Sequence, residues 1–198
     1  MSEPIAEILE TKEVFHKRIF RWLSIRFRAK KFDGTLSEPI EHLVLNRGDS
    51  VGILLHDLAT DEIVLVEQFR VSAFENGPGR LLEIPAGRID DGESAEASAK
   101  REAIEETGAE PESIQLVASF YLSPGACTER LSLFYCPFPT GLTVLAHAGL
   151  AHESEDLRVH RVPTLEADEM VKNGTIIDAK SIIAIQWLLA QRQAKLGR

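Results

Sequence analysis

Residues 87–109 read GRIDDGESAEASAKREAIEETGA, and this stretch decides how the rest of the chain is interpreted. Ser94 can accept a hydrogen bond from the first turn of a helix, and Ala95–Thr107 contains mostly good helix formers. Gly108 can adopt the left-handed backbone conformation that commonly ends a helix. The stretch therefore predicts a helix over Ala95–Thr107, with Ser94 as its N-cap and Gly108 at its end.

Three glutamates would share one side of this helix. At about 100° per residue, Glu102, Glu105 and Glu106 project within roughly one third of the helix circumference. Like charges crowded in this way repel unless a cation lies between them, and Mg²⁺ and Mn²⁺ prefer such hard oxygen ligands. Arg101 lies four residues before Glu105 and can orient one carboxylate. The alternative is an exposed acidic helix with surface ion pairs.

Small residues accompany the acidic row. Ala95, Ala99 and Ala103 run alongside the three glutamates. We expect their small size to leave room for a metal ion and for phosphate groups.

The composition fits an ordinary enzyme. The 198 residues are 44% hydrophobic, which is enough for one substantial core. The formal charge of −9 argues against general nucleic-acid binding, although a metal ion and local arginines can still favour a small anionic substrate. Met1–Phe15 is acidic and lacks a continuous apolar run, so no secretory signal is expected. The most apolar helical stretch, Ile182–Ala190, is far too short to span a membrane.

The chain contains two cysteines, Cys127 and Cys136, without the paired spacing of a metal site. Isolated thiols in a cytoplasmic protein are expected, and a disulfide between the two stays open.

The remaining pattern predicts an N-terminal sheet and a larger α/β domain. Ile19–Lys30 and Pro39–Asn46 are expected to be strands joined by an Asp33-Gly34 turn, in an antiparallel sheet too small to be stable alone. Further strands are expected at Val51–Leu55, Ile63–Phe69, Leu81–Ile84, Ile114–Tyr121, Leu131–Cys136 and Leu157–Val162, and further helices at Leu165–Lys172 and Ala179–Lys195.

The opening stretch resembles the Nudix box, the signature of the Nudix hydrolases. The matching positions are Gly87, Glu93, Arg101, Glu102, Glu105, Glu106 and Gly108. Ala103 and Ala109 stand where the family prefers a bulky aliphatic residue. The resemblance implies an α/β fold, the Nudix α/β/α sandwich with a mixed sheet, plus the small N-terminal antiparallel sheet. Residues 1–47 would form a dimerising segment, and residues 48–198 the Nudix hydrolase domain.

Motifs outside the box resemble the ADP-ribose pyrophosphatase branch of this family. They are Glu67-Gln68-Phe69-Arg70, Leu82–Gly87, Ser123-Pro124-Gly125, His152–His160 and Ile182–Leu188. The neighbouring GDP-mannose pyrophosphatases share the Ser-Pro-Gly turn and much of the ending. The resemblance implies Mg²⁺-dependent hydrolysis of a nucleoside diphosphate sugar, foremost ADP-ribose to AMP and ribose 5-phosphate. GDP-mannose or another nucleotide sugar is the alternative substrate.

The resemblance also implies roles for individual residues. The implied metal ligands are the backbone carbonyl of Ala86 and the carboxylates of Glu102, Glu106 and Glu155. They would hold two or three Mg²⁺ ions per site, with Mn²⁺ as a possible substitute. Glu153 matches the general base of the family, since a carboxylate that is not bound to metal can take a proton from the attacking water. Glu105 and Arg101 complete the catalytic set, with Glu105 beside the metal ligands rather than among them.

The implied substrate-binding residues are Arg47, Arg70, Arg88, Glu129 and Phe20. Arg47 and Arg70 match arginines near the nucleotide and phosphates, and Glu129 matches a contact to the terminal ribose. Phe20 would approach the base from the partner subunit of a homodimer with exchanged N-terminal segments. A surface ion pair is the alternative for the charged residues, and a buried hairpin aromatic is the alternative for Phe20.

One position departs from the family pattern and leaves the purine open. His42 stands where similar family members place an arginine against the adenine. Two other classes of function fit the sequence less well. A non-catalytic Nudix module that senses a nucleotide tends to have eroded carboxylates or a fused DNA-binding domain, and the chain shows neither. A plain interaction protein would leave the acidic constellation unexplained.

Overall fold

The computed structural model of the chain describes residues 4–138, 141–149 and 156–196. They form two compact units. The smaller unit combines Met1–Asp49 with Tyr121–Arg130, and the larger unit combines Ser50–Phe120 with Leu131–Arg198. Because Tyr121–Arg130 is distant in sequence from the N-terminal residues, its place in the smaller unit is visible only in the structure.

The smaller unit contains a three-stranded antiparallel sheet, which confirms the predicted N-terminal sheet. Its strands are β1 (Ala6–Lys17), β2 (Phe20–Ala29) and β3 (Ile40–Asn46), in the order β1-β2-β3. The predicted turn precedes β3: Gly34 has a φ of 87°, and the Asp33 carboxylate accepts the Thr35 N–H at 2.9 Å.

Strand β1 was not predicted, and its irregular pairing explains why. Its register with β2 shifts between Ile8 and Glu10 and again between Glu13 and Phe15. Each irregularity interrupts the alternation of inward and outward side chains by which a strand is identified in a sequence. All twelve residues of β1 are exposed.

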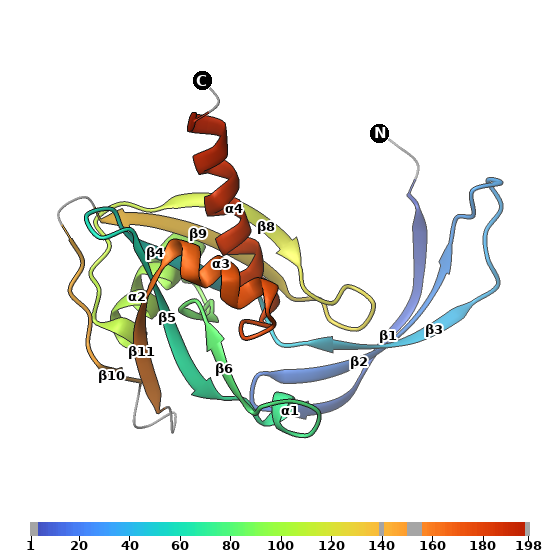
Figure 1. The fold of residues 1–198 in the computed structure, drawn as a ribbon. Coiled ribbons are helices and arrows are strands. Elements are labelled where there is room, and N and C mark those ends of the chain that lie inside the picture. The colour runs from blue at the N-terminus through green and yellow to red at the C-terminus, as the bar shows by residue number, and fades with distance from the viewer. Residues whose placement is uncertain (1–3, 139–140, 150–155, 197–198) are drawn as a thin grey trace. The chain divides into compact units, whose positions relative to one another are not determined.

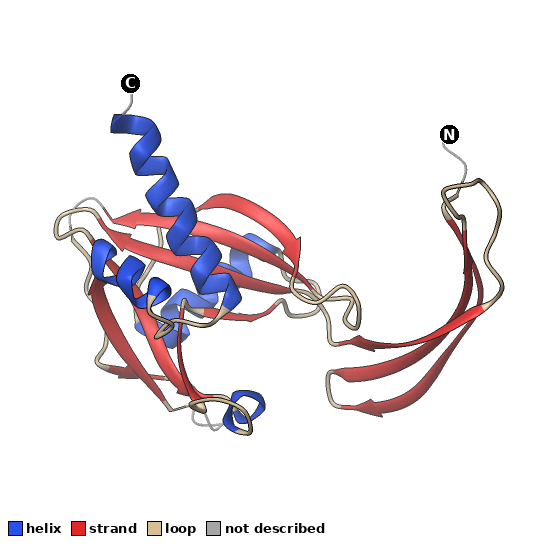
Figure 2. Ribbon diagram, turned by 45° about the vertical axis from the view of Figure 1, so that its right-hand side comes forward, coloured by secondary structure: helices blue, strands red, loops and turns tan. Residues whose placement is uncertain are grey.

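The larger unit is built on a mixed eight-stranded sheet (Figures 1 and 2). Its strands are β4 (Ser50–Asp57), β5 (Glu62–Phe69), β6 (Arg80–Glu83), β7 (Ala86–Arg88), β8 (Gln115–Tyr121), β9 (Arg130–Phe138), β10 (His147–Ala148) and β11 (Leu157–Pro163). The order is β10-β11-β5-β4-β9-β8, with β6 paired to β5 and β7 paired to β4. Strands β4 and β9 run parallel. The helices are α1 (Val71–Phe74), α2 (Ala95–Thr107), α3 (Thr164–Lys172) and α4 (Ala179–Leu196).

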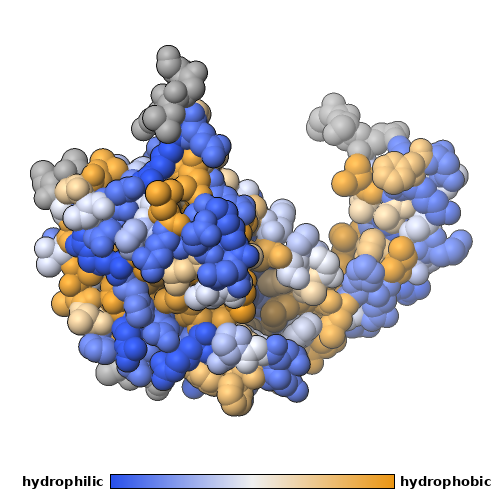
Figure 3. All heavy atoms as spheres, viewed as in Figure 1, coloured by the Kyte–Doolittle hydropathy of each residue, from blue (hydrophilic) through white to orange (hydrophobic). Residues whose placement is uncertain are grey.

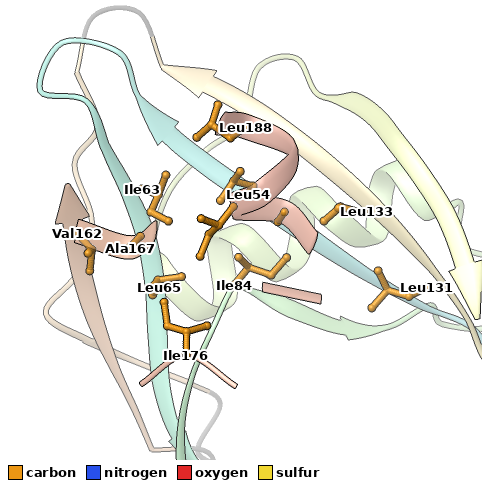
Figure 4. Close-up of a cluster of buried hydrophobic side chains, with 12 residues drawn as sticks. Leu54, Ile63, Leu65, Ile84, Leu131, Leu133, Val162, Ala167, Ile176 and Leu188 are labelled. Carbon is orange, nitrogen blue, oxygen red and sulfur yellow. The ribbon is translucent and has the colours of Figure 1, made fainter. Parts of the chain in front are cut away.

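Helices cover both faces of this sheet, which confirms the predicted α/β/α sandwich. On one face, residues of α3 and α4 such as Ala167 and Leu188 pack with Leu54 and Leu133 of the sheet (Figure 4). On the other face, α2 packs against the alternate residues of β4. All eight residues of β4 are buried, as expected for a central strand covered on both sides.

The local prediction for α2 is confirmed at both ends. The Ser94 side chain accepts a hydrogen bond from the Ala97 N–H at 3.1 Å. Gly108 has a φ of 73°, and its N–H donates to the Ile104 carbonyl at 2.8 Å. These caps begin and end the helix at the predicted residues.

The expectation for the small residues of α2 was wrong. Ala99 and Ala103 are fully buried in the apolar cluster formed with the sheet, and Ala95 packs at its edge. Their small side chains allow the helix backbone to approach β4 closely, so they leave no space for metal or phosphate. The acidic residues and the alanines thus belong to adjacent parts of one buried helix face.

Both cysteines are free thiols, and burial raises the pKa of Cys136 to about 11. Among the described residues, no helix is both long and apolar enough to cross a bilayer.

A polar cluster joins the β4–β5 turn to α4. The buried His56 places Nδ1 at 2.9 Å from the Tyr135 hydroxyl and Nε2 at 3.1 Å from Asp61. Arg192 of α4 donates to both carboxylate oxygens of Asp61 and lies 3.2 Å from His56 Nε2. Burial and the neighbouring Arg192 charge lower the pKa of His56 to about 4. The imidazole is therefore neutral at pH 7.

Acid should destabilise the larger unit through His56. Because the folded-state pKa of about 4 lies below the ordinary value of 6.5, the unfolded chain binds the proton more tightly. The contribution of neutral His56 to the unfolding free energy is fully present above pH 6.5. It is lost as the pH falls toward 4, and the total loss is about 3 kcal/mol. In denaturant titrations, the difference in unfolding free energy between wild type and His56→Gln should narrow over this range. Parallel pH curves for the two proteins would contradict the assignment.

Candidate active site

Two glutamates of α2 lie against the backbone of β7. The Ala86 N–H donates to Glu106 Oε2 at 3.0 Å. The Glu102 carboxylate occupies the space that a Cβ at residue 87 would need, so a residue larger than glycine would displace this carboxylate. Because the φ of Gly87 lies outside the left-handed region, close approach rather than backbone strain requires this glycine. The local structure thus brings Ala86, Glu102 and Glu106 together.

These two carboxylates are buried. Glu102 is 9% exposed and Glu106 is 2% exposed. The alternative of an exposed acidic helix is therefore wrong for both residues. A carboxylate at such a position needs charged or hydrogen-bonding partners, and a helix that buries two of them is unusual unless the site has a use for their charge.

Arg101 connects the helix to the loop before it. Its Nη1 donates to Glu102 Oε1 and to Glu105 Oε2, both at 2.8 Å, so the expected ion pair with Glu105 is present. Its Nε and Nη2 donate to the two oxygens of Glu93 at 3.1 Å. Nη2 also donates to the Arg88 carbonyl at 3.1 Å. One guanidinium therefore fixes three carboxylates and the backbone that follows Gly87.

The charges in this network stabilise one another. Hydrogen bonds to Glu93, with the carboxylates of Glu102 and Glu105, raise the pKa of Arg101 further above its ordinary value. The hydrogen bonds from Arg101 lower the pKa of Glu93 below the usual range of a glutamate. Glu93 is therefore ionised at neutral pH.

Arg70 directly follows β5 and is held by Glu83, a residue whose role the sequence did not indicate. Its Nε and Nη2 donate to the two oxygens of Glu83 at 2.9 and 3.0 Å. Glu83 is only 2% exposed. The available signal was a charged residue within the apolar strand Leu81–Ile84, directly before Pro85-Ala86-Gly87.

The oxygen atoms gathered here are of the type that binds a divalent cation. A backbone carbonyl at Ala86 and the carboxylates of Glu102 and Glu106 are the hard oxygens that Mg²⁺ and Mn²⁺ prefer. Within residues 4–138, 141–149 and 156–196, no group of three His, Cys, Asp or Glu side chains could hold a metal by itself. Glu153 and Glu155, the expected base and the expected late ligand, lie outside the described residues.

The other residues expected to bind substrate are divided between the two units. In the larger unit, the Arg88 side chain pairs with Asp90 at 2.8 Å. In the smaller unit, Arg47 and Glu129 form an ion pair at 3.5 Å, so these two predicted binding residues are brought together. Phe20, at the start of β2, is 42% exposed, which excludes a buried hairpin aromatic within this chain.

His42, also in the smaller unit, forms a T-shaped contact with the Phe27 ring at a centroid distance of 5.2 Å. This contact joins a side chain of β3 to one of β2.

Comparison with known proteins agrees with this arrangement. Residues 46–182 match the family described as the NUDIX domain. An ADP-ribose pyrophosphatase of Escherichia coli is 39% identical over 184 residues, which cover 92% of this chain and 88% of that protein. A GDP-mannose pyrophosphatase of Pectobacterium atrosepticum is 36% identical over 188 residues, which cover 94% of each.

A solved structure described as an ADP compounds hydrolase shares the fold. It matches with a TM-score of 0.70 at 19% identity and covers 96% of this chain and 98% of its own. The family match spans well over half of the sequence, and it includes the helix whose buried glutamates face Ala86 and Gly87. The chain therefore belongs to the Nudix hydrolase family and is similar to its ADP-ribose pyrophosphatases.

Proposed function

We propose that this protein hydrolyses the diphosphate of a nucleoside diphosphate sugar, foremost ADP-ribose, to AMP and ribose 5-phosphate. The observation that carries the proposal is the pair of buried carboxylates, Glu102 and Glu106, held against the backbone of Ala86 and Gly87. The similarity to ADP-ribose pyrophosphatases supports the choice of substrate.

Ala86, Glu102 and Glu106 would hold Mg²⁺, and Glu155 would add a fourth ligand. Two or three ions per site are expected, and Mn²⁺ could replace Mg²⁺. The ions would neutralise the diphosphate and make a water molecule more acidic.

The side chains of the protein would position the reactants. Arg101 keeps Glu102 and Glu105 in place through its 2.8 Å hydrogen bonds. Arg70 and Arg88 would bind the negatively charged phosphates. Glu153 would take a proton from water as the water oxygen bonds to one phosphorus, and the bridging oxygen would leave with the other. Arg47, Glu129 and the partner subunit's Phe20 would bind the sugar and base.

A substrate comparison tests the proposal. The two groups of relatives differ little in identity, 39% against 36%, so GDP-mannose is the second candidate. We expect kcat/KM for ADP-ribose to exceed that for GDP-mannose at least about tenfold, as one good base contact is worth about 1.4 kcal/mol or more. A preference for GDP-mannose would instead identify the protein as a GDP-mannose pyrophosphatase. No hydrolysis of either, or of other nucleotide sugars, would favour a nucleotide-sensing module.

Gly87→Ala should nearly abolish this activity. The added Cβ would overlap the Glu102 carboxylate and push this end of the side chain out of its present position. A displacement of about 1 Å in a metal-binding carboxylate costs roughly 10²-fold in rate. Steady-state assays of ADP-ribose hydrolysis measure this loss.

Gly174→Ala is the matched control. Gly174 has a φ of 80° with open space where its Cβ would lie, so the change strains the backbone without any overlap. It should lower the unfolding temperature while kcat stays within about threefold of wild type. Equal kcat losses in both variants would mean that Gly87 acts only through stability.

We also infer a cytoplasmic homodimer formed through the N-terminal segment. Strand β1 exposes apolar side chains, including Ile8 at 62%, Val14 at 55% and Phe15 at 53%. Figure 3 shows hydrophobic residues on the surface of the N-terminal sheet. A small sheet with this much exposed apolar surface needs cover from another chain.

Light scattering should give about twice the chain mass of 22.0 kDa. Phe15→Ser should weaken the dimer at least about tenfold, because buried aromatic anchors dominate such interfaces. Lys17→Ala, on the same strand, should leave the dimer intact. A monomeric wild type would contradict the inference.

A further inference from the structure

We propose that Lys180, in the first turn of α4, positions Arg70 for the substrate through Glu83. The inference rests on the proposed function, because it assumes that Arg70 binds the diphosphate. Lys180 itself is 8% exposed and contacts Glu83 and Asp178. It is therefore a positioning residue rather than a catalytic one.

A continuous chain of contacts connects α4 to Arg70. Lys180 Nζ donates to Glu83 Oε2 at 2.5 Å. The same carboxylate accepts from Arg70 Nε at 2.9 Å and from Arg70 Nη2 at 3.0 Å. Glu83 thus lies between two cations and fixes the plane of the guanidinium by a bidentate contact.

The first turn of α4 also fixes the backbone beside Glu83. Asp178, which accepts Lys180 Nζ at 3.0 Å, accepts the Ser181 N–H at 3.0 Å in the manner of a helix cap. The Ser181 hydroxyl in turn accepts the Ile84 N–H at 2.8 Å. Both the side chain of Glu83 and the backbone of the next residue are therefore attached to the same turn of α4.

Arg70, Lys180, Glu83 and Asp178 form a cluster of charged side chains. Their positive and negative charges are equal in number only when Lys180 is present. Burial alone would raise the pKa of Glu83, but the hydrogen bonds and charges of Arg70 and Lys180 hold it below its ordinary value. With Glu83 and Asp178, the two cations give a formally neutral group. Without Lys180, Arg70 would be the one cation of the cluster facing two carboxylates, and it would be drawn toward them.

Arg70 keeps part of its guanidinium accessible to an anion. Its Nη1 has no hydrogen-bond partner among the residues that the structure describes, and its side chain is 39% exposed. Although burial opposes its charge, Glu83 and the more distant carboxylates of Glu106 and Asp178 raise the pKa of Arg70. Glu83, which holds this guanidinium, precedes Ala86, one of the proposed metal ligands, by three residues.

A double-mutant cycle tests this role. With ADP-ribose, or with GDP-mannose if that substrate is preferred, Lys180→Met should raise KM about tenfold while kcat changes less than about threefold. This pattern is expected for loss of binding made equally in the ground and transition states. In an Arg70→Met background, the Lys180→Met change should alter KM less than about twofold, because the residue through which it acts is gone.

KM separates positioning from a purely structural effect. Partial unfolding lowers the concentration of active enzyme and hence the apparent kcat, but it leaves KM unchanged. If Lys180→Met is insoluble, the uncharged but polar Lys180→Gln takes its place in the cycle. Lys172→Met is the matched control, because it removes the same charge from an exposed residue of α3 that pairs with Asp168 and Glu169. Its KM should equal that of wild type.

An unchanged KM in the Lys180 variant would overturn the proposal, as would independent effects of the Lys180 and Arg70 changes. Failure of the proposed function looks different. In that case the wild-type protein would hydrolyse no nucleoside diphosphate sugar, whereas an active wild type with independent effects would reject only the role of Lys180.

Discussion

Glu106→Gln should lower kcat for ADP-ribose hydrolysis at least ~10²-fold and leave the fold intact. The residue is 2% exposed and accepts the Ala86 N–H, and an amide oxygen can still accept that hydrogen bond. What the variant loses is the negative charge required by a divalent cation. Glu102→Gln should behave in the same way. Turnover and thermal unfolding, measured on the same preparations, check both expectations.

Glu96→Gln provides the control on the same helix. Glu96 is an exposed residue in the first turn of α2 and pairs with Lys100 at 3.1 Å. Removing its charge should leave kcat within about twofold of wild type, since such surface pairs contribute little. A Glu106→Gln enzyme with a near-normal rate at saturating Mg²⁺ would overturn the metal assignment.

Glu153→Gln is expected to have the second large effect, a loss of kcat of roughly 10²-fold or more. We expect Glu153 to accept a proton from the attacking water. An amide at this position cannot accept that proton, because it is far less basic than a carboxylate. The variant should keep the metal requirement of wild type and should lose part of the acidic limb of the pH–rate profile.

Glu155→Gln is the informative comparison, because a lost metal ligand should instead raise the metal concentration needed for activity. Equal impairment of metal binding in the two variants would mean that their roles are shared or reversed. A nearly active Glu153→Gln enzyme would place the base elsewhere, and Glu105 would be the first candidate.

The features that the sequence predicted well are local. Helix α2 begins after Ser94 and ends before Gly108 because each cap depends on residues within one turn. The central strands were also identified, since β4 and β5 are continuous apolar runs. Strand β1 was not identified, because its register shifts interrupt the alternation of side chains between the two faces of a strand.

The features that the sequence missed depend on distant contacts. Glu83 and Lys180 are separated by 97 positions, and only the fold brings their charges together. The alanines of α2 were misread for a related reason: helical periodicity shows which residues share a side, but not what that side packs against. Nothing in the sequence alone indicated that Tyr121–Arg130 belongs to the unit containing Arg47.

The most direct test of the account is a product analysis with ADP-ribose. Purified protein with Mg²⁺ should yield AMP and ribose 5-phosphate in equal amounts. Removal of the metal by EDTA should stop the reaction, added Mg²⁺ should restore it, and Glu106→Gln should form almost no product. Absence of nucleoside monophosphate from every nucleoside diphosphate sugar tested, with Mg²⁺ or Mn²⁺, would contradict the account, as would equal rates with and without metal.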